Sequence, residues 1–273
     1  MRAAPALRIV QVGIATTLQD HGRAGLAHLG VPVAGAVERH THDLVNRLVG
    51  NPTNAATIET MGALIVEALR PVVLASSTDG SRRTLAAGDR LRVDAPPGSV
   101  WAYLAARGGI DARAVLGSRS HDTLGGVGPP PLVAGALLTI GADPGTDLSA
   151  DHAPPRTATA DPLRIWDGPQ HDWFVGGADC LVRRSWRVTS ELSRVGVRLE
   201  SGEFPRRSRS LGRMPSMGLV DGAIQVTPAG EPIVMLANRP ATGGYPVIAV
   251  VEPDDLPILT QMRPGSSVRF RPA

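Results

Sequence analysis

Residues 141–162 read GADPGTDLSADHAPPRTATADP, and this stretch decides how the chain is divided. It is rich in Pro, Ala, Asp and Thr and has almost no large apolar side chain, so it cannot bury itself and is typical of a linker. The chain has 273 residues, which suggests one large or two modest domains at roughly 150 residues per domain. We predict an N-terminal β subdomain over residues 1–140, a linker over 141–162 and a C-terminal β-barrel subdomain over 163–273.

Short apolar runs recur on both sides of this linker and are separated by glycine and proline. With 31 Gly and 24 Pro, the pattern of many short strands and frequent turns predicts sandwiches or barrels. The runs expected to be strands are 7–12, 64–66, 72–75, 91–93, 100–105, 137–140, 163–166, 233–236 and 247–251. The predicted fold class is therefore mainly β.

Only a few short helices are expected. Apolar residues recur at helical spacing in residues 39–49, and Gly50 follows as a C-terminal cap. A second short helix is predicted over 54–61. The acidic segment 252–256 contains a proline and predicts the start of a third helix.

The composition excludes several classes of chemistry. All 28 basic residues are arginine, and without a lysine the chain cannot form a Walker A loop, a Schiff base, a Ser-Lys amidase pair or a biotin attachment site. The net charge is only +3 and aromatic residues are 3%, so we expect no nucleic-acid partner. Cys180 is the single cysteine, which excludes an intrachain disulfide and a multi-cysteine zinc site.

The sequence also lacks signals for a membrane. No apolar run approaches the ~20 residues that a membrane-spanning helix needs. Residues 1–10 carry two arginines but no long apolar core, so we expect no signal peptide. The expectation is a cytoplasmic protein without a membrane partner.

The first polar cluster is TLQDHGR at residues 17–23. Arg23 would grip a carboxylate with its guanidinium fork while Gln19 and Asp20 fix the orientation. The alternative is a polar turn stabilised by its own Asp20–Arg23 pair, and the local sequence favours this turn.

A second cluster surrounds the first expected helix. Glu38 stands at its start, and Asn46 and Asn51 flank its end. One carboxylate and two amides suit a urea-like or lactam group. Equally, the three residues could be caps and turn formers, since buried asparagines need partners.

Glycine-rich segments follow at 107–109, at 116–120 with Arg119, and at 125–128. Such backbone can cradle anions, but without a lysine, loops at the ends of strands are the better interpretation. Histidines two apart on a helix do not face each other. From His28, Glu38, His40 and His42 we therefore expect no metal site.

Polar motifs also lie beyond the linker. They are DGPQ at 167–170, SRVGVRL at 193–199, AIQ at 223–225 and NRPATGGYP at 238–246. In the last motif a hydroxyl, two glycines and a phenol adjoin, which fits the rim of a site for a small polar ligand.

Taken in order, these clusters resemble one family, allophanate hydrolase subunit 2, also described as the C component of the bacterial ATP-dependent 5-oxoprolinase. The family includes the carboxyltransferase part of urea carboxylase and the antagonist of a sporulation-kinase inhibitor. The resemblance covers essentially the whole chain. It is carried by QDHGR at 19–23, NRLVGN at 46–51, GGI at 108–110, GSRS at 117–120, GPQ at 168–170, SRVG at 193–196 with Arg198 and Leu199, AIQ at 223–225 and TGGYP at 242–246.

This resemblance implies two linked, cyclophilin-like β-barrel subdomains and an enzyme that is active only in a heteromeric complex. The partners would be the B component, which is allophanate hydrolase subunit 1 or kinase-inhibitor-like, and the A component of the 5-oxoprolinase. The B and C components together would use ATP, with Mg, to activate a small cyclic amide, and the A component would hydrolyse the activated species. Two alternatives stay open: biotin-dependent carboxyl transfer to a urea-like acceptor, and non-enzymatic antagonism of a kinase inhibitor.

The resemblance also implies site residues. Asp20, Arg23 and Glu38 are the catalytic candidates: Arg23 neutralises charge, and the two acids position or accept a proton. The substrate-binding candidates are Gln19, Asn46, Asn51, Arg119, Arg194, Arg198, Gln225, Asn238, Thr242, Gly243, Gly244 and Tyr245. No metal ligand is among them.

The sequence departs from the family pattern at two candidate residues and at two positions next to Thr242. Glu38, Asn238, Pro240 and Ala241 stand where the family usually has Asp, Asp, Gln and Thr. If the aspartate replaced by Asn238 were a base, the substitution would disable it, which mildly favours a shifted substrate or a binding role.

Overall fold

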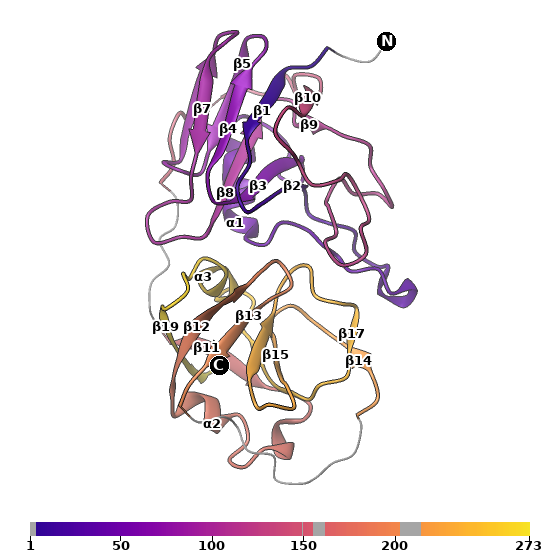
Figure 1. Ribbon diagram of the computed structural model, residues 1–273, viewed down its shortest axis with the longest axis vertical. Helices are drawn as coiled ribbons and strands as arrows, with labels where there is room; N and C mark the ends of the chain where they lie inside the picture. Colours follow the sequence, from indigo (N-terminus) through magenta and orange to yellow (C-terminus); the bar gives the residue numbers. More distant parts are fainter. Residues whose placement is uncertain (1–3, 149, 155–161, 203–213) are drawn as a thin grey trace. The chain divides into compact units, whose positions relative to one another are not determined.

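The computed structural model describes residues 4–148, 150–154, 162–202 and 214–273 (Figure 1). The chain divides into two compact units. The first comprises Met1–Arg23 and Ala34–Thr157, and the second comprises Ala24–Val33 and Ala158–Ala273.

Two antiparallel five-stranded sheets build the first unit. Their strands are β1 (Leu7–Gln11), β2 (Ala15–Gln19), β3 (Thr57–Met61), β4 (Leu64–Ala68), β5 (Val72–Ser76), β6 (Ser81–Leu85), β7 (Arg90–Val93), β8 (Trp101–Ala106), β9 (Ile110–Asp111) and β10 (Leu137–Ile140). The strand orders are β7-β4-β1-β10-β9 and β2-β3-β8-β5-β6. Ile9 and Leu64 from one sheet and Ile58 and Leu104 from the other are fully or almost fully buried in one apolar cluster, so both sheets share a core.

The helix α1 (Arg39–Leu48) belongs to this unit and confirms the prediction for residues 39–49. Val45 and Leu48 are buried on its apolar side. Gly50 follows with φ +70°, a left-handed conformation that glycine adopts without steric cost, and its N–H returns to the Arg47 carbonyl.

The helix predicted over 54–61 is wrong, because most of this segment is strand β3. Ile58 lies between Leu18 of β2 and Leu104 of β8, in the middle of a sheet. Thr57, Ile58 and Thr60 are β-branched, and their stiff side chains favour an extended backbone that packs on both neighbours.

A closed seven-stranded barrel dominates the second unit. Its strands are β11 (Leu163–Asp167), β12 (Ser185–Leu192), β13 (Gly196–Glu200), β15 (Ala223–Val226), β16 (Pro232–Met235), β18 (Val247–Val251) and β19 (Ser267–Pro272). The order is β11-β18-β15-β16-β13-β12-β19, and the ring closes through the parallel pair β19 and β11. A further small sheet pairs β14 (Met217–Gly218) with β17 (Thr242–Gly243).

The helices of the second unit are short. They are η1 (Ala27–Leu29), η2 (His171–Trp173), α2 (Asp179–Val182) and α3 (Leu256–Thr260). A helix does follow the acidic segment 252–256, but α3 begins only at Leu256. The acidic residues therefore precede the helix, and the proline in its first turn is Pro257 instead of Pro253. The mainly β fold with few helices is confirmed, and each predicted apolar run overlaps a strand.

The domain boundaries stay a prediction, but part of the expected linker has a defined place. The Arg107 guanidinium pairs with Asp143 at 2.7 Å, and the Thr146 hydroxyl donates to the Gly50 carbonyl at 2.6 Å. Arg82 pairs with Asp151. The described residues of this stretch thus lie against the first unit, and residues 155–161 lie outside the described part. Among the described residues, none of the helices is long and apolar enough to span a membrane.

Candidate functional site

Asp20 is the centre of a buried hydrogen-bond network in the turn after β2. Its Oδ1 accepts from Gly22 N at 2.8 Å, Ser118 Oγ at 2.5 Å and Ser120 Oγ at 2.6 Å, and its Oδ2 accepts from Arg119 N at 2.6 Å. Burial raises the pKa of Asp20, but these hydrogen bonds outweigh burial and hold the pKa below its ordinary value. The carboxylate is ionised and anchors the 118–120 loop, which makes it a weak proton acceptor.

Arg23 follows in the same turn and is only 3% exposed. Its Nη2 donates to the Ser120 carbonyl and its Nε to the Val115 carbonyl at 3.4 Å. Burial lowers the pKa of Arg23, while the charges of Asp20 and Asp122 raise it. Within the described part of the chain, Nη1 has no hydrogen-bond partner, so one buried N–H pair is left for an acceptor.

Gln19 supplies the complementary group. Its Nε2 donates to Thr17 Oγ1 at 2.9 Å and to the His121 carbonyl at 3.1 Å. Its Oε1 is buried and lacks a partner among the described residues. Gln19 Oε1 can accept a hydrogen bond and Arg23 Nη1 can donate one, and both atoms are buried away from solvent.

The glycine-rich segment 125–128 packs against this network. A Cβ at Gly128 would lie 2.1 Å from the Ser120 carbonyl oxygen and 3.1 Å from Arg23 Nη2. The structure therefore brings together the first cluster and two of the glycine-rich segments, with Arg119 partly buried and its Nε donating to the Ala112 carbonyl at 2.9 Å.

Glu38 is the N-cap of α1. Its Oε1 accepts from His40 N at 2.8 Å and its Oε2 from Thr41 N at 3.0 Å. Its own N–H donates to the Tyr103 hydroxyl, which donates in turn to Glu59 Oε2, each at 2.8 Å. Burial and the charges of Glu59 and Glu38 raise the pKa of Tyr103 well above its usual value. Both Glu38 oxygens serve the helix end, which favours the capping interpretation over proton transfer.

Asn46 and Asn51 bind each other and the surrounding backbone. Asn46 Nδ2 donates to the Ala55 carbonyl at 2.9 Å, and its Oδ1 accepts from Asn51 Nδ2 at 3.1 Å. Asn51 Nδ2 also donates to the Ala106 carbonyl at 2.8 Å, and its Oδ1 accepts from Gly108 N at 2.8 Å. These contacts use the amide groups to fasten the end of α1 to β8, so the geometry favours a structural role for both.

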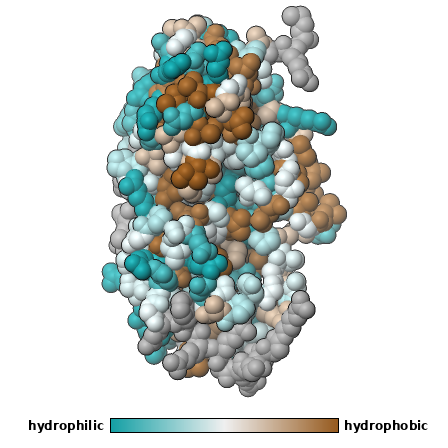
Figure 2. Space-filling model, viewed as in Figure 1, coloured by the Kyte–Doolittle hydropathy of each residue, from teal (hydrophilic) through white to brown (hydrophobic). Residues whose placement is uncertain are grey.

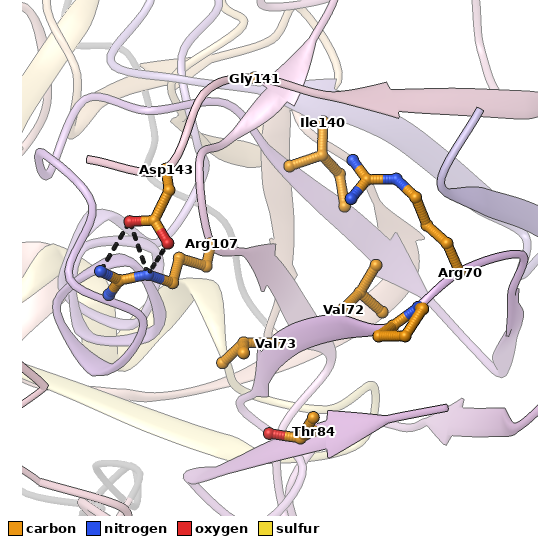
Figure 3. Close-up of a pocket in the computed structure, with 9 residues that line it drawn as sticks. Arg70, Val72, Val73, Thr84, Arg107, Ile140, Gly141 and Asp143 are labelled. Carbon is orange, nitrogen blue, oxygen red and sulfur yellow. Dashed lines mark hydrogen bonds and ion pairs between the residues drawn. The ribbon is translucent and has the colours of Figure 1, made fainter. Parts of the chain in front are cut away.

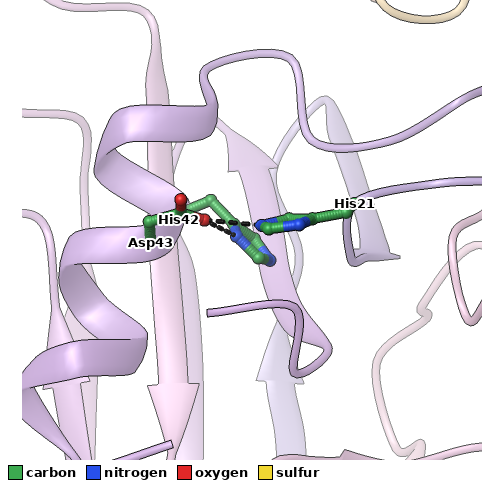
Figure 4. A group of neighbouring side chains, drawn as sticks. All are labelled: His21, His42 and Asp43. Atoms are coloured by element: carbon green, nitrogen blue, oxygen red, sulfur yellow. Dashed lines mark hydrogen bonds and ion pairs between the residues drawn. The ribbon is translucent and has the colours of Figure 1, made fainter. Parts of the chain in front are cut away.

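His21, His42 and Asp43 form a further cluster, which no sequence pattern predicted. Their ligand atoms lie within 4.8 Å of one another, and Figure 4 shows both imidazoles beside the carboxylate. His21 comes from the turn after β2 and the other two from α1, so helical spacing alone gave no signal for it. His21 stands in the QDHGR motif, about 20 residues before His42 and Asp43. A local sequence pattern does not reveal a contact between residues so far apart in the chain.

None of the candidate residues lines the cavity drawn in Figure 3. This cavity has a volume of about 230 Å³ and lies in the first unit, with Arg70, Val72, Ile140, Arg107 and Asp143 on its wall. Arg107 turns toward Asp143, to which its Nε donates at 2.8 and 2.9 Å.

A second group of candidates gathers in the barrel unit. Gln225 is buried, and its Nε2 donates to the Tyr245 carbonyl at 2.8 Å. A Cβ at Gly243 would lie 2.7 Å from Gln225 Nε2 and 2.8 Å from Leu219 Cδ1, so only glycine fits there without a shift. The structure thus joins the AIQ and TGGYP motifs, with Thr242 exposed on β17 and the side chain of Tyr245 partly exposed.

Gln170 of the DGPQ motif supports this group. Its Oε1 accepts from Val247 N at 2.9 Å and its Nε2 contacts Met217 Sδ at 3.2 Å. This buried amide ties β18 to β14, whose partner strand β17 carries Gly243. Gln170 is a positioning residue that the candidate list omits, although its motif was recognised.

The remaining candidates are arginines, Asn238 and Gly244. Arg194 and Asn238 are buried, and Asn238 N donates to the Arg194 carbonyl at 3.0 Å. Arg198 pairs through Nε with Glu191 at 3.0 Å and through Nη1 with Glu231. Two carboxylates therefore already neutralise Arg198. A Cβ added at Gly244 would meet no atom closer than 3.9 Å, so this position could accommodate a side chain.

Comparison with known proteins agrees with the resemblance noted in the sequence. The model for the carboxyltransferase domain, subdomain A and B, matches residues 29–272. The C component of 5-oxoprolinase from Escherichia coli (strain K12) is 33% identical over 97% of this chain and 90% of that protein.

Solved structures share the fold. The crystal structure of TTHA0988 has a TM-score of 0.88 and 32% identity over 99% of this chain, which spans 57% of that chain. The K. lactis urea amidolyase has a TM-score of 0.84 and 26% identity, and this chain spans 19% of it. Since the family model covers most of the sequence and the Escherichia coli relative is similar over almost all of it, the chain belongs to the family of the carboxyltransferase domain, subdomains A and B.

Proposed function

We propose that this chain is the C component of a 5-oxoprolinase-type complex, in which it helps the B component to activate a cyclic amide with ATP before the A component hydrolyses it. The observation that carries the proposal is the 33% identity to the C component of 5-oxoprolinase over 97% of the chain. A cytoplasmic location belongs to the same proposal, since the co-substrate would be ATP, bound with Mg.

The chemistry of such a step matches what the first unit offers. Transfer of the γ-phosphoryl group of ATP to the lactam oxygen forms an O–P bond, breaks the β–γ bond and releases ADP. Water then adds to the activated carbon and the ring C–N bond breaks, with the nitrogen taking up protons to become the free amine, which leaves an acyl phosphate. A second water hydrolyses the acyl phosphate to a carboxylate and inorganic phosphate. Arg23 has a buried, unpaired Nη1 suited to an oxygen that gains negative charge in this sequence.

Gln19 would orient the planar amide through its unpaired Oε1, which accepts the lactam N–H. In the barrel unit, Gln225 and the Thr242–Tyr245 segment, with Arg194 and Asn238, form a second and separate group of candidate ligand contacts. Within the first unit, Asp20, Glu38, Asn46 and Asn51 would position the surrounding backbone, because their polar atoms are engaged in the network of the fold.

Partner subunits are part of the proposal. Large hydrophobic side chains are exposed in both units, and Figure 2 shows hydrophobic surface on the face viewed. They include Ile14, Leu116, Leu124, Val133 and Leu137 in the first unit and Trp166, Val175 and Val220 in the second. Contacts with other subunits would remove this surface from water.

A second candidate function is biotin-dependent carboxyl transfer to a urea-like acceptor. It is favoured by the similarity to the K. lactis urea amidolyase, at a TM-score of 0.84. Urea is also a planar amide and would use the same groups on Gln19 and Arg23. Because this chain has no lysine, the biotin carrier would have to come from another domain or chain.

The test is an assay of the chain co-purified with its neighbouring A and B components. We expect ADP and glutamate release that requires 5-oxoproline, loss of this activity in Arg23→Ala, and normal activity in Arg8→Ala, whose exposed guanidinium pairs with Glu67 on the surface. Urea and allophanate, with a biotin carrier, serve as parallel substrates. Turnover of urea alone would replace the first proposal by the second, and a stable complex without any turnover would point to a regulatory binding role.

A further inference from the structure

Three side chains with metal-binding atoms converge next to the end of β2 (Figure 4). His21 Nε2 lies 2.7 Å from Asp43 Oδ1, and His42 Nδ1 lies 3.1 Å from the same oxygen. One carboxylate oxygen therefore faces two imidazole nitrogens. The residues come from two segments of the first unit, the turn at His21 and the helix α1.

The hydrogen bonds of His42 can be satisfied in two ways, by a second proton on the ring or by a cation held between Nδ1 and Asp43. Its Nε2 lies 3.2 Å from the Gln19 carbonyl oxygen, which can only accept a hydrogen bond, and its Nδ1 faces the carboxylate of Asp43. A neutral imidazole has one N–H, so it cannot donate to both. When Nε2 donates to Gln19, the lone pair of Nδ1 points at a negative oxygen. This histidine-to-carbonyl bond is also the usual outer contact of a metal-bound histidine.

The cluster is buried at His42 and open to solvent at Asp43 and His21. The His42 side chain is fully buried, whereas those of Asp43 and His21 are 19% and 32% exposed, so an ion can reach the cluster from solvent. The backbone of His21 is held in place: a Cβ at Gly35 would lie 2.7 Å from its carbonyl, and Arg39 Nη2 donates to its oxygen at 3.2 Å.

We propose that His21, His42 and Asp43 bind one divalent transition-metal ion, with zinc as the best fit. Two imidazole nitrogens and one carboxylate oxygen form a common zinc ligand set that leaves a fourth position for water. Zinc with bonds of about 2.0–2.1 Å places tetrahedral ligands about 3.3 Å apart, so the two separations from Asp43 Oδ1 need to open by about 0.6 Å or less. The ligand atoms of the two histidines lie within 4.8 Å of each other and would have to reach the same spacing. The site is independent of the proposed amide chemistry.

The test is a titration of the full chain after treatment with a chelator. Calorimetry with Zn²⁺ should give one equivalent bound, and Co²⁺ should give visible absorption bands typical of nitrogen and oxygen ligation. In His21→Gln and Asp43→Asn the affinity should fall at least about tenfold, since each removes a ligand. The control His40→Gln, on an exposed position of the same helix, should bind as the wild type does.

The partly exposed His21 and Asp43 are the informative positions, because replacing the buried His42 risks the fold. Circular dichroism of each variant confirms that it is folded. The proposal is overturned if the wild-type chain binds no stoichiometric Zn²⁺, or binds it equally in His21→Gln and His40→Gln. It is also overturned if nuclear magnetic resonance shows His42 protonated on both nitrogens with excess Zn²⁺ present, which would make the cluster an ion pair.

Discussion

The Asp20 carboxylate accepts a hydrogen bond of 2.5 Å from the hydroxyl of Ser118, a residue 98 positions later in the chain. This bond links two motifs, QDHGR and GSRS, neither of which is specific when taken separately. It places the loop whose carbonyls receive Arg23, so the orientation of that guanidinium depends on Asp20.

Asp20→Asn should lower the free energy of unfolding by about 2–3 kcal/mol at neutral pH, because hydrogen bonds to a charged acceptor are replaced by weaker ones. The folded-state pKa of Asp20 is depressed. Its contribution is therefore present above the unfolded pKa of about 3.9 and is lost as the pH falls through the folded pKa.

Urea denaturation of both proteins from about pH 7 down to about pH 2.5 measures this effect. The difference between wild type and variant should shrink in acid. The exposed Asp167 offers a matched control, and Asp167→Asn should change little. A difference that does not depend on pH would contradict the ionised network.

Gly243→Ala should disturb the barrel unit, because the new methyl group would meet Gln225 Nε2 at 2.7 Å and Leu219 Cδ1 at 2.8 Å. Both atoms are the far ends of side chains and can move aside, so we expect a cost near the lower end of the about 1–3 kcal/mol that overpacking takes. It also strains the bond from Gln225 to Tyr245, so KM of the assembled complex should rise. Gly218→Ala on the paired strand is the control, since nothing lies within 4 Å of its added Cβ. Equal melting temperatures for the two variants would refute the close approach.

Asn51→Ala should destabilise the first unit by about 2–4 kcal/mol, because it takes the Asn51 partner away from Gly108 N and from the buried Asn46 Oδ1. It also removes one of the hydrogen bonds to the Ala106 carbonyl, which keeps the one from Gly109 N. Asn54→Ala, at an exposed position in the same loop, should be neutral. Chemical denaturation checks both. A variant at position 51 that keeps its stability but loses substrate affinity would instead support the substrate-binding role.

Glu38→Ala should cost about 1–2 kcal/mol, the usual loss when an N-cap is removed. Glu38→Asp should keep the stability, because aspartate is a good N-cap and its shorter side chain still reaches the first turn. Thermal unfolding distinguishes the two. In the assay of the complex, Glu38→Gln should retain activity in proportion to the folded fraction; loss of turnover in a fully stable Glu38→Gln would make Glu38 a proton carrier.

The mainly β fold was predictable because short apolar runs and frequent glycine and proline are local signals. The segment 54–61 was wrongly predicted as a helix, because a short stretch with threonine, isoleucine and an acidic residue gives no clear local signal. Its strand conformation is determined by pairing with β2 and β8. The site was harder, since Asn46 and Asn51 suit a ligand-binding role and a structural role equally well until their partners are known. His21 and Asp43 meet through the packing of a turn on a helix, and no periodicity encodes that contact.

The barrel of the second unit is closed by its own first and last strands, with Leu163 of β11 opposite Phe270 of β19. The polypeptide therefore enters and leaves this barrel at neighbouring strands. Because these two strands are parallel, the chain enters at one end of the wall and leaves at the other. Removing either strand would open the ring, so the first and last segments of the barrel depend on each other.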